Sequence, residues 1–110
     1  MTLDEYQQEA LVTAKFSGNE LLDLAHWTLG VTGESGEIAE KVKKIIRDQD
    51  GSVPDETKKE LTKEIGDVLW YLAVLAKHLG VNFDEVGATN IAKLRSRQAR
   101  DVIHGSGDNR

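Results

Sequence analysis

Apolar residues recur along the chain at intervals of three and four, a pattern that predicts helices. Thr2 and Glu5 have the spacing of a capping box, so the first helix is expected to begin there. No stretch alternates between apolar and polar residues in the manner of a strand. The pattern predicts four helices, at about residues 2–15, 20–47, 55–79 and 82–100. The second is open to a break near Gly30 or Gly33, since glycine is costly inside a helix.

The third predicted helix is apolar around nearly its whole circumference, reading GDVLWYLAVLAKHL from residue 66 to 79. A helix of this kind is normally buried on all sides, whereas four short helices in one chain cover only one face of each. We therefore expect it to pack against a second subunit as well, most simply in a two-fold dimer. The expected fold is an all-α, four-helix bundle-like domain over 1–103, followed by a polar tail, HGSGDNR, at 104–110.

Composition narrows the classes of function. The formal net charge of −5 disfavours nucleic-acid binding, because that affinity comes mainly from Lys and Arg on phosphates. The absence of cysteine excludes disulfides and thiolate-held metals and fits a cytoplasmic location. The N-terminus has neither a basic nor an apolar leader segment, so no signal peptide is expected. The longest apolar run, 68–76, is too short to span a bilayer, so no membrane role is expected.

Two acid-x-x-acid patterns stand out: Glu34 with Glu37 in the second helix, and Glu64 with Asp67 in the third. Residues three apart on a helix lie on one face, about 5–6 Å apart. If the two helices fold back as an antiparallel hairpin, the two pairs fall at the same level. Four carboxylates facing each other repel unless a cation lies between them. Oxygen ligands without His or Cys favour Mg²⁺, with Mn²⁺ as a substitute.

The alternative for Glu34 and Glu37 is that they are solvated acids on a helix surface, where Glu is common. Asp67 differs because it begins an apolar run and is flanked by Ile65 and Val68. An uncompensated charge in apolar surroundings would be costly, and Asp is a mediocre helix former. The sequence therefore favours a metal-binding role for Asp67.

At these residues the sequence resembles the MazG-like nucleotide pyrophosphohydrolases, part of the all-α NTP pyrophosphatase superfamily. That family carries E-x-x-E, a spacer, and E-x-x-D, which here are Glu34, Glu37, Glu64 and Asp67. The surrounding segments GESGEIAEKVKKIIRD, KEIGDVLWYLAVLAKHLG and NIAKLRSR are also similar to the family. Ser35 departs from members that have another acid beside the first Glu, which leaves open the number of metals and the group that orients the water.

The resemblance implies a helical bundle that assembles as a homodimer or homotetramer. It implies Mg²⁺-dependent hydrolysis of a nucleoside triphosphate, with a deoxy form favoured, to the monophosphate and pyrophosphate. The four acids would bind Mg²⁺, and Glu34 or Glu37 would act as general base. Substrate-binding candidates are Lys41 and Lys44 beside the acids, Tyr71 for stacking on the base, and Asn90, Lys93 and Arg97 on the fourth helix.

Two other functions remain open. One is a phosphoribosyl-ATP pyrophosphohydrolase-like enzyme, a relative with the same chemistry. The other is a non-catalytic helical module for dimerisation or regulation, against which Asp67 argues. The tail at 104–110 is expected by default to be disordered; the resemblance at GSGDNR offers a second role, closure over bound nucleotide with Arg110 near phosphate.

Overall fold

The computed structural model describes residues 1–48 and 51–110. Within these ranges it contains no strand and has four helices, α1 (Leu3–Leu11), α2 (Glu20–Asp48), α3 (Asp55–His78) and α4 (Phe83–Ala99). The predicted all-α class is therefore confirmed, and α3 and α4 begin and end within a residue or so of the predicted positions. No helix in the described part of the chain combines the length and apolarity needed to cross a membrane.

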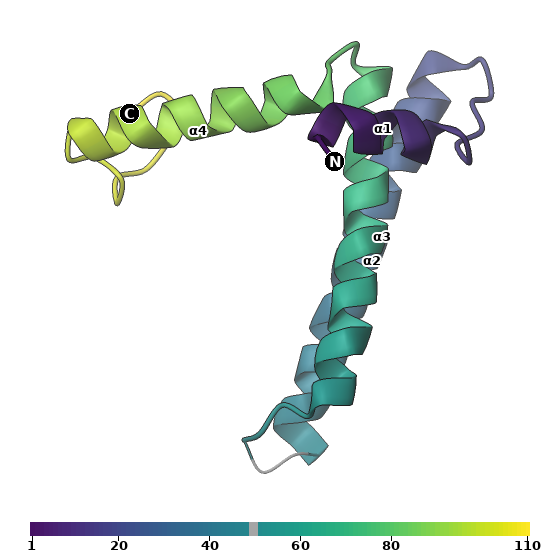
Figure 1. Cartoon of the computed structure of the whole chain (residues 1–110), viewed down its shortest axis with the longest axis vertical. Helices are drawn as coiled ribbons and strands as arrows, with labels where there is room; N and C mark the ends of the chain where they lie inside the picture. Colours follow the sequence, from purple (N-terminus) through teal and green to yellow (C-terminus); the bar gives the residue numbers. More distant parts are fainter. Residues whose placement is uncertain (49–50) are drawn as a thin grey trace.

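The longest helices, α2 and α3, lie side by side as the predicted antiparallel hairpin (Figure 1). The prediction of a helix at about 20–47 is confirmed, and the break left open near Gly30 or Gly33 does not occur, because α2 is continuous from Glu20 to Asp48. Gly30 is explained by packing: a Cβ there would lie 2.1 Å from Cε1 of Tyr71. The glycine lets the Tyr71 ring approach the α2 backbone and so brings the two helices close together.

The buried core lies where α1, α3 and the start of α4 meet, and Gln7 connects the three segments. Gln7 is buried, and its amide donates to the carbonyls of Ala73 (3.0 Å) and Val81 (3.1 Å). Its side-chain oxygen accepts from the backbone N–H of Phe83 at 3.2 Å. The capping box at Thr2 is present as predicted, but α1 ends at Leu11, earlier than expected. The buried apolar residues of this core are Ala10, Ala73, Ala76 and Phe83.

The fourth helix points away from the hairpin, which makes the chain L-shaped (Figure 1). It contacts α1 and α3 but not α2. The turn is made at Gly80, whose φ of +77° follows the end of α3. The radius of gyration is 17.0 Å, against about 13 Å for a compact domain of this length. The expectation of a bundle is thus wrong for a single chain, because the turn and the Gln7 contacts aim α4 outward.

An apolar groove remains open inside the elbow between α3 and α4. It encloses about 230 Å³. Leu72 on its wall is 38% exposed and Leu79 is 61% exposed. One chain therefore leaves part of the apolar surface of α3 uncovered, as the sequence pattern predicted. The lining residues are Leu72, Leu75, Ala76, Leu79, Val81, Phe83 and Val86.

The C-terminal tail folds back against α4 and is hydrogen-bonded to it. The Arg110 guanidinium donates to the carbonyls of Val102 (2.9 Å) and Ile103 (2.7 Å). A Cβ at Gly105 would lie 2.6 Å from Cδ of Arg110, and Gly107 has a φ of +83°. The glycines of HGSGDNR are thus required by this local fold. The default expectation of a disordered tail is wrong.

Candidate active site

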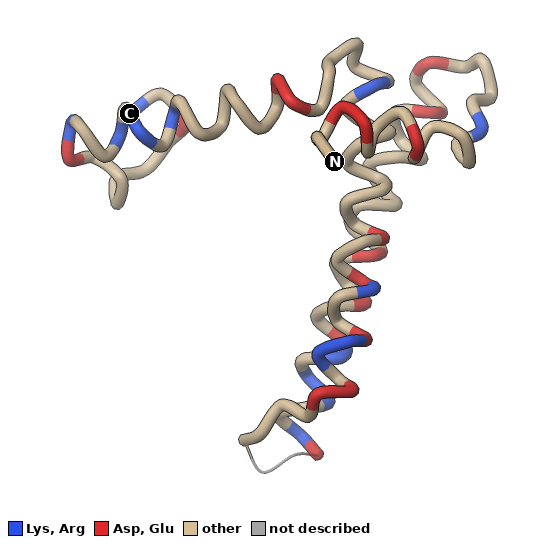
Figure 2. Tube along the Cα trace, in the orientation of Figure 1, with Lys and Arg blue, Asp and Glu red and all other residues tan. Residues whose placement is uncertain are grey.

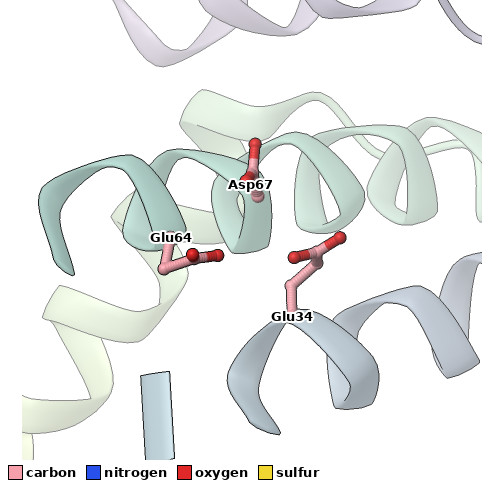
Figure 3. A group of neighbouring side chains, drawn as sticks. All are labelled: Glu34, Glu64 and Asp67. Atoms are coloured by element: carbon pink, nitrogen blue, oxygen red, sulfur yellow. The ribbon is translucent and has the colours of Figure 1, made fainter. Parts of the chain in front are cut away.

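The hairpin brings together three of the four predicted acids: Glu34 from α2, and Glu64 and Asp67 from α3 (Figure 3). One carboxylate oxygen from each lies within 4.8 Å of the others. Glu34 and Glu64 are half-buried, whereas Asp67 is exposed. The reasoning that placed Asp67 in apolar surroundings is therefore wrong, since Asp67 faces the open side of the hairpin. What distinguishes it is its proximity to two other acids.

Glu37 lies outside this group and is exposed. On α2 only Glu34 reaches the shared point, whereas on α3 both Glu64 and Asp67, which are also three residues apart, reach it. The structure thus does not bring Glu37 and Glu64 to a common point, as the sequence analysis expected. Glu37 is still near enough for its charge to contribute to raising the pKa of Glu34.

The three-acid cluster carries unbalanced negative charge. Burial raises the pKa of the Glu34 carboxyl above its usual range, and the charges of Asp67 and Glu64 raise it further. Among the described residues, Lys41 is the basic side chain paired with the cluster, with its Nζ 3.5 Å from Glu64 Oε1. In the part of the chain that the structure describes, no ion pair involves Glu34 or Asp67. The site therefore favours a cationic ligand.

A divalent cation with a preference for oxygen fits the cluster. Mg²⁺ binds oxygen at about 2.1 Å, so ligand oxygens on opposite sides of the ion are about 4.2 Å apart. The observed limit of 4.8 Å is slightly larger, and small rotations of flexible Glu side chains close that difference. The donors are carboxylates alone, without His or Cys, which is the set that Mg²⁺ and Mn²⁺ prefer.

Two neighbours of the cluster were not predicted from the sequence. Tyr6 on α1 lies close enough to Asp67 for the carboxylate to raise the phenol's pKa, although burial is the larger cause. Gly30, one turn before Glu34, sets the close approach of α2 and α3 through its contact with Tyr71. Neither was detectable in the sequence, because both depend on which helix faces which.

Some predicted substrate-binding residues lie on the hairpin with the acids. Lys41 and Lys44 line a polar pocket of about 200 Å³ on the side of the cluster toward the interhelical turn. Tyr71 is one turn beyond Asp67 on the opposite side, and its ring meets Trp70 edge to face with centroids 4.9 Å apart. Tyr71 is therefore part of the helix–helix packing. Its predicted stacking on a base stays a prediction.

The other predicted substrate-binding residues, Asn90, Lys93 and Arg97, lie on α4. At about 1.5 Å per residue, Asp67 and Lys93 are each about 20 Å from the turn at Gly80, along different arms. One chain therefore does not bring α4 to the acids. Figure 2 shows acidic and basic residues interleaved along the hairpin and a group of basic residues at the far end of α4. Asn90 and Lys93 line a groove of about 430 Å³ along α4, which shares Val81 and Val86 with the elbow groove.

Comparisons with known proteins give two matches. A sequence model of the MazG nucleotide pyrophosphohydrolase domain matches residues 24–101, a span that contains all four predicted acids. The chain is 47% identical over 114 residues to the Gene 37 protein of Mycobacterium phage L5, and the match covers 100% of both chains. No solved structure matches the chain significantly.

Proposed function

Because the chain belongs to the MazG nucleotide pyrophosphohydrolase family, we propose that it hydrolyses a nucleoside triphosphate, preferably a deoxynucleoside triphosphate, to the monophosphate and pyrophosphate with Mg²⁺. The observation that carries the proposal is the convergence of Glu34, Glu64 and Asp67 across the hairpin. Clustered acids repel a polyanionic substrate, so the site needs a cation before it accepts a triphosphate. These three residues would hold the Mg²⁺.

The acids divide into two roles. A bound Mg²⁺ supplies positive charge for the phosphates and makes a bound water more acidic. Glu34, Glu64 and Asp67 would hold the ion, whereas Glu37 is exposed beside the cluster and available to accept a proton. Glu37 takes the proton of the water that attacks the α-phosphorus, and the bond to the bridging oxygen of the β-phosphate breaks. Pyrophosphate then leaves.

The residues around the cluster determine which way the phosphates and the base of the substrate point. Lys41 and Lys44 line the pocket on the turn side, where their charges suit the β- and γ-phosphates. The opposite side carries aromatic rings: Tyr71, and His26 stacked on the buried Trp27 with centroids 4.5 Å apart. The sugar and base lie toward these rings.

A second copy of the chain completes the site. Asn90, Lys93 and Arg97 lie too far from the acids to act within one chain, and the elbow groove leaves apolar surface on α3 for a partner. In a homodimer or homotetramer, α4 of one subunit reaches the acid cluster of another. This explains why an outward-pointing helix carries phosphate-binding residue types.

Mixing two inactive variants tests this sharing. Asp67→Asn removes a metal ligand and Lys93→Ala removes a residue supplied by the partner. In a random 1:1 mixture of dimers, half are mixed, and one of the two sites in each mixed dimer is intact. Activity should return to about one quarter of wild type. Absence of any recovery would mean that Lys93 acts in the same subunit as Asp67 or not at all.

An activity panel tests the reaction itself. Purified protein is incubated with ribo- and deoxynucleoside triphosphates and with phosphoribosyl-ATP, with and without Mg²⁺. We expect the monophosphate and pyrophosphate as products, and none in EDTA. Release of orthophosphate, or no turnover together with no thermal stabilisation by Mg²⁺, would favour the non-catalytic helical module.

A further inference from the structure

The tail places one carboxylate between two of the basic residues on α4. Asp108 Oδ1 lies 3.0 Å from Lys93 Nζ and 3.2 Å from Arg97 Nη2. Arg97 is 5% exposed, whereas the Asp108 side chain is 82% exposed. The basic pair is thus occupied by an anion of the chain itself, and that anion is open to solvent and to competitors.

The tail backbone is anchored independently of this carboxylate. Arg97 Nη2 also donates to the carbonyl of Asp108 at 2.8 Å, and Arg100 Nη2 donates to the carbonyl of Arg110 at 2.7 Å. The Arg110 side chain ties the end of the tail to the carbonyls of Val102 and Ile103, in the segment that follows α4. The Asp108 side chain can therefore turn away from Lys93 and Arg97 while the rest of the tail stays in place.

The buried guanidinium has hydrogen-bonding capacity left. Arg97 Nε is buried and has no hydrogen-bond partner in the described part of the chain. A buried donor without a partner costs free energy, and an Arg is suited to oxyanions with several acceptor oxygens. A carboxylate oxygen shared by Lys93 and Arg97 resembles one oxygen of a bound phosphoryl group, and a phosphoryl group offers more acceptors.

We propose that Asp108 is an internal competitor for substrate phosphates, so that the tail forms an autoinhibitory latch on Lys93 and Arg97. The inference rests on the phosphate-binding role proposed above for these two residues. Since the carboxylate is tethered beside them, its effective concentration is high and it is present before any ligand. A triphosphate displaces it because it brings more charge and more acceptor oxygens, whereas a monophosphate competes less well.

The test is Asp108→Asn, which removes the charge and keeps the size of the side chain. Asp101→Asn is the matched control: it makes the same change in the same segment, and Asp101 takes part in no ion pair among the described residues. Asn also tolerates the φ of 57° at this position. With Mg²⁺ present, we expect Asp108→Asn to lower KM by about twofold to tenfold at unchanged kcat, because a carboxylate paired with Lys93 and Arg97 no longer competes with the substrate. Asp101→Asn should match wild type.

Calorimetry with inorganic tripolyphosphate and Mg²⁺ separates this inference from the proposed function. Asp108→Asn should bind tripolyphosphate about twofold to tenfold more tightly than wild type. Equal binding overturns the latch even if the protein is an active hydrolase. Tighter binding by a protein that hydrolyses no nucleotide supports the latch and overturns the hydrolase. A raised KM in Asp108→Asn also overturns the latch, since the tail would then help to close over nucleotide.

Discussion

The hairpin and the outer part of α4 differ in how their charged side chains are arranged. On the hairpin, Glu34, Glu64 and Asp67 bring like charges together, and the pKa of Glu34 is raised. On the outer arm, Lys93 and Arg97 surround Asp108, and hydrogen bonds from both lower its pKa. The hairpin cluster therefore has an excess of negative charge, whereas the charges on the outer arm are paired within the chain.

The difference identifies which region depends on a ligand. Like charges held together cost free energy, so the region that holds them is the one that gains from a cation. The balanced arm needs nothing for stability, and a ligand there must replace an existing partner. This contrast supports the proposals that a metal binds on the hairpin and that anions compete on the arm.

The largest expected effect comes from Asp67→Asn. Removing one charge from the cluster should leave the metal-free protein as stable as wild type or more so. Stabilisation by Mg²⁺ should shrink, and kcat should fall by roughly a hundredfold or more, because a metal ligand is lost. Thermal melts with and without Mg²⁺, together with rate measurements, check this. Asp55→Asn, an exposed acid on the same helix, serves as control.

A structural role for Asp67 would give the reverse pattern. Loss of a buried ion pair costs about 3–5 kcal/mol and would leave the Mg²⁺ response intact. A strongly destabilised Asp67→Asn protein that still responds fully to Mg²⁺ would mean that Asp67 is not a metal ligand. The hairpin would then not differ from the arm in its need for a cation.

A charge in the elbow groove tests whether a subunit contact brings α4 of one chain to the acid cluster of another. Leu79→Glu places a carboxylate on the exposed groove wall and leaves the buried core unchanged. We expect the assembly to dissociate and KM to rise about tenfold or more, since buried charge at an interface is costly. Light scattering and dilution kinetics measure both effects. Val12 is an exposed apolar residue outside the groove, so Val12→Glu should change neither the assembly nor KM.

Two glycine substitutions in α2 test how closely the hairpin must pack to form the cluster. Gly30→Ala pushes a methyl group into the Tyr71 ring and should cost about 1–3 kcal/mol of stability. Gly33→Ala meets nothing within 4 Å and should stabilise the helix by about 0.5–1 kcal/mol. Urea unfolding compares the pair. Equal effects would show that the approach of Tyr71 to α2 does not hold the acids in place.

The smallest effects are in carboxyl titrations, which NMR follows residue by residue. Without metal, Glu34 should titrate above the usual pKa of Glu and Asp108 below that of Asp. Stability from Asp108 is present above the unfolded pKa and is lost as the pH falls through the folded pKa. Glu34 acts oppositely: stability falls as the pH rises from its unfolded pKa through its raised folded one. Mg²⁺ should lower the pKa of Glu34 and leave Asp108 unchanged; a normal Glu34 titration would contradict the unbalanced cluster.

The sequence by itself located the helices and three of the acids of the candidate site. Apolar periodicity and turn residues located α3 and α4, and the equal distance of the two acid pairs from the turn predicted that carboxylates of an antiparallel hairpin would face each other, which holds for three of the four. These features are local, or follow from a single reversal of the chain, so a pattern of residue types encodes them.

Only the tertiary structure decided the features that depend on which surfaces meet. Gly30 reads as a helix breaker until the Tyr71 ring is seen against it. The outward course of α4 depends on the hydrogen bonds of the Gln7 side chain to the backbone of Ala73, Val81 and Phe83. These three residues are far from Gln7 in the sequence. Only the packing of α2 against α3 shows that Glu34 and not Glu37 joins the cluster, and the ordered tail follows from the side-chain hydrogen bonds of Arg110. Periodicity shows which face of a helix is apolar, but the partner of that face is chosen by packing between distant segments.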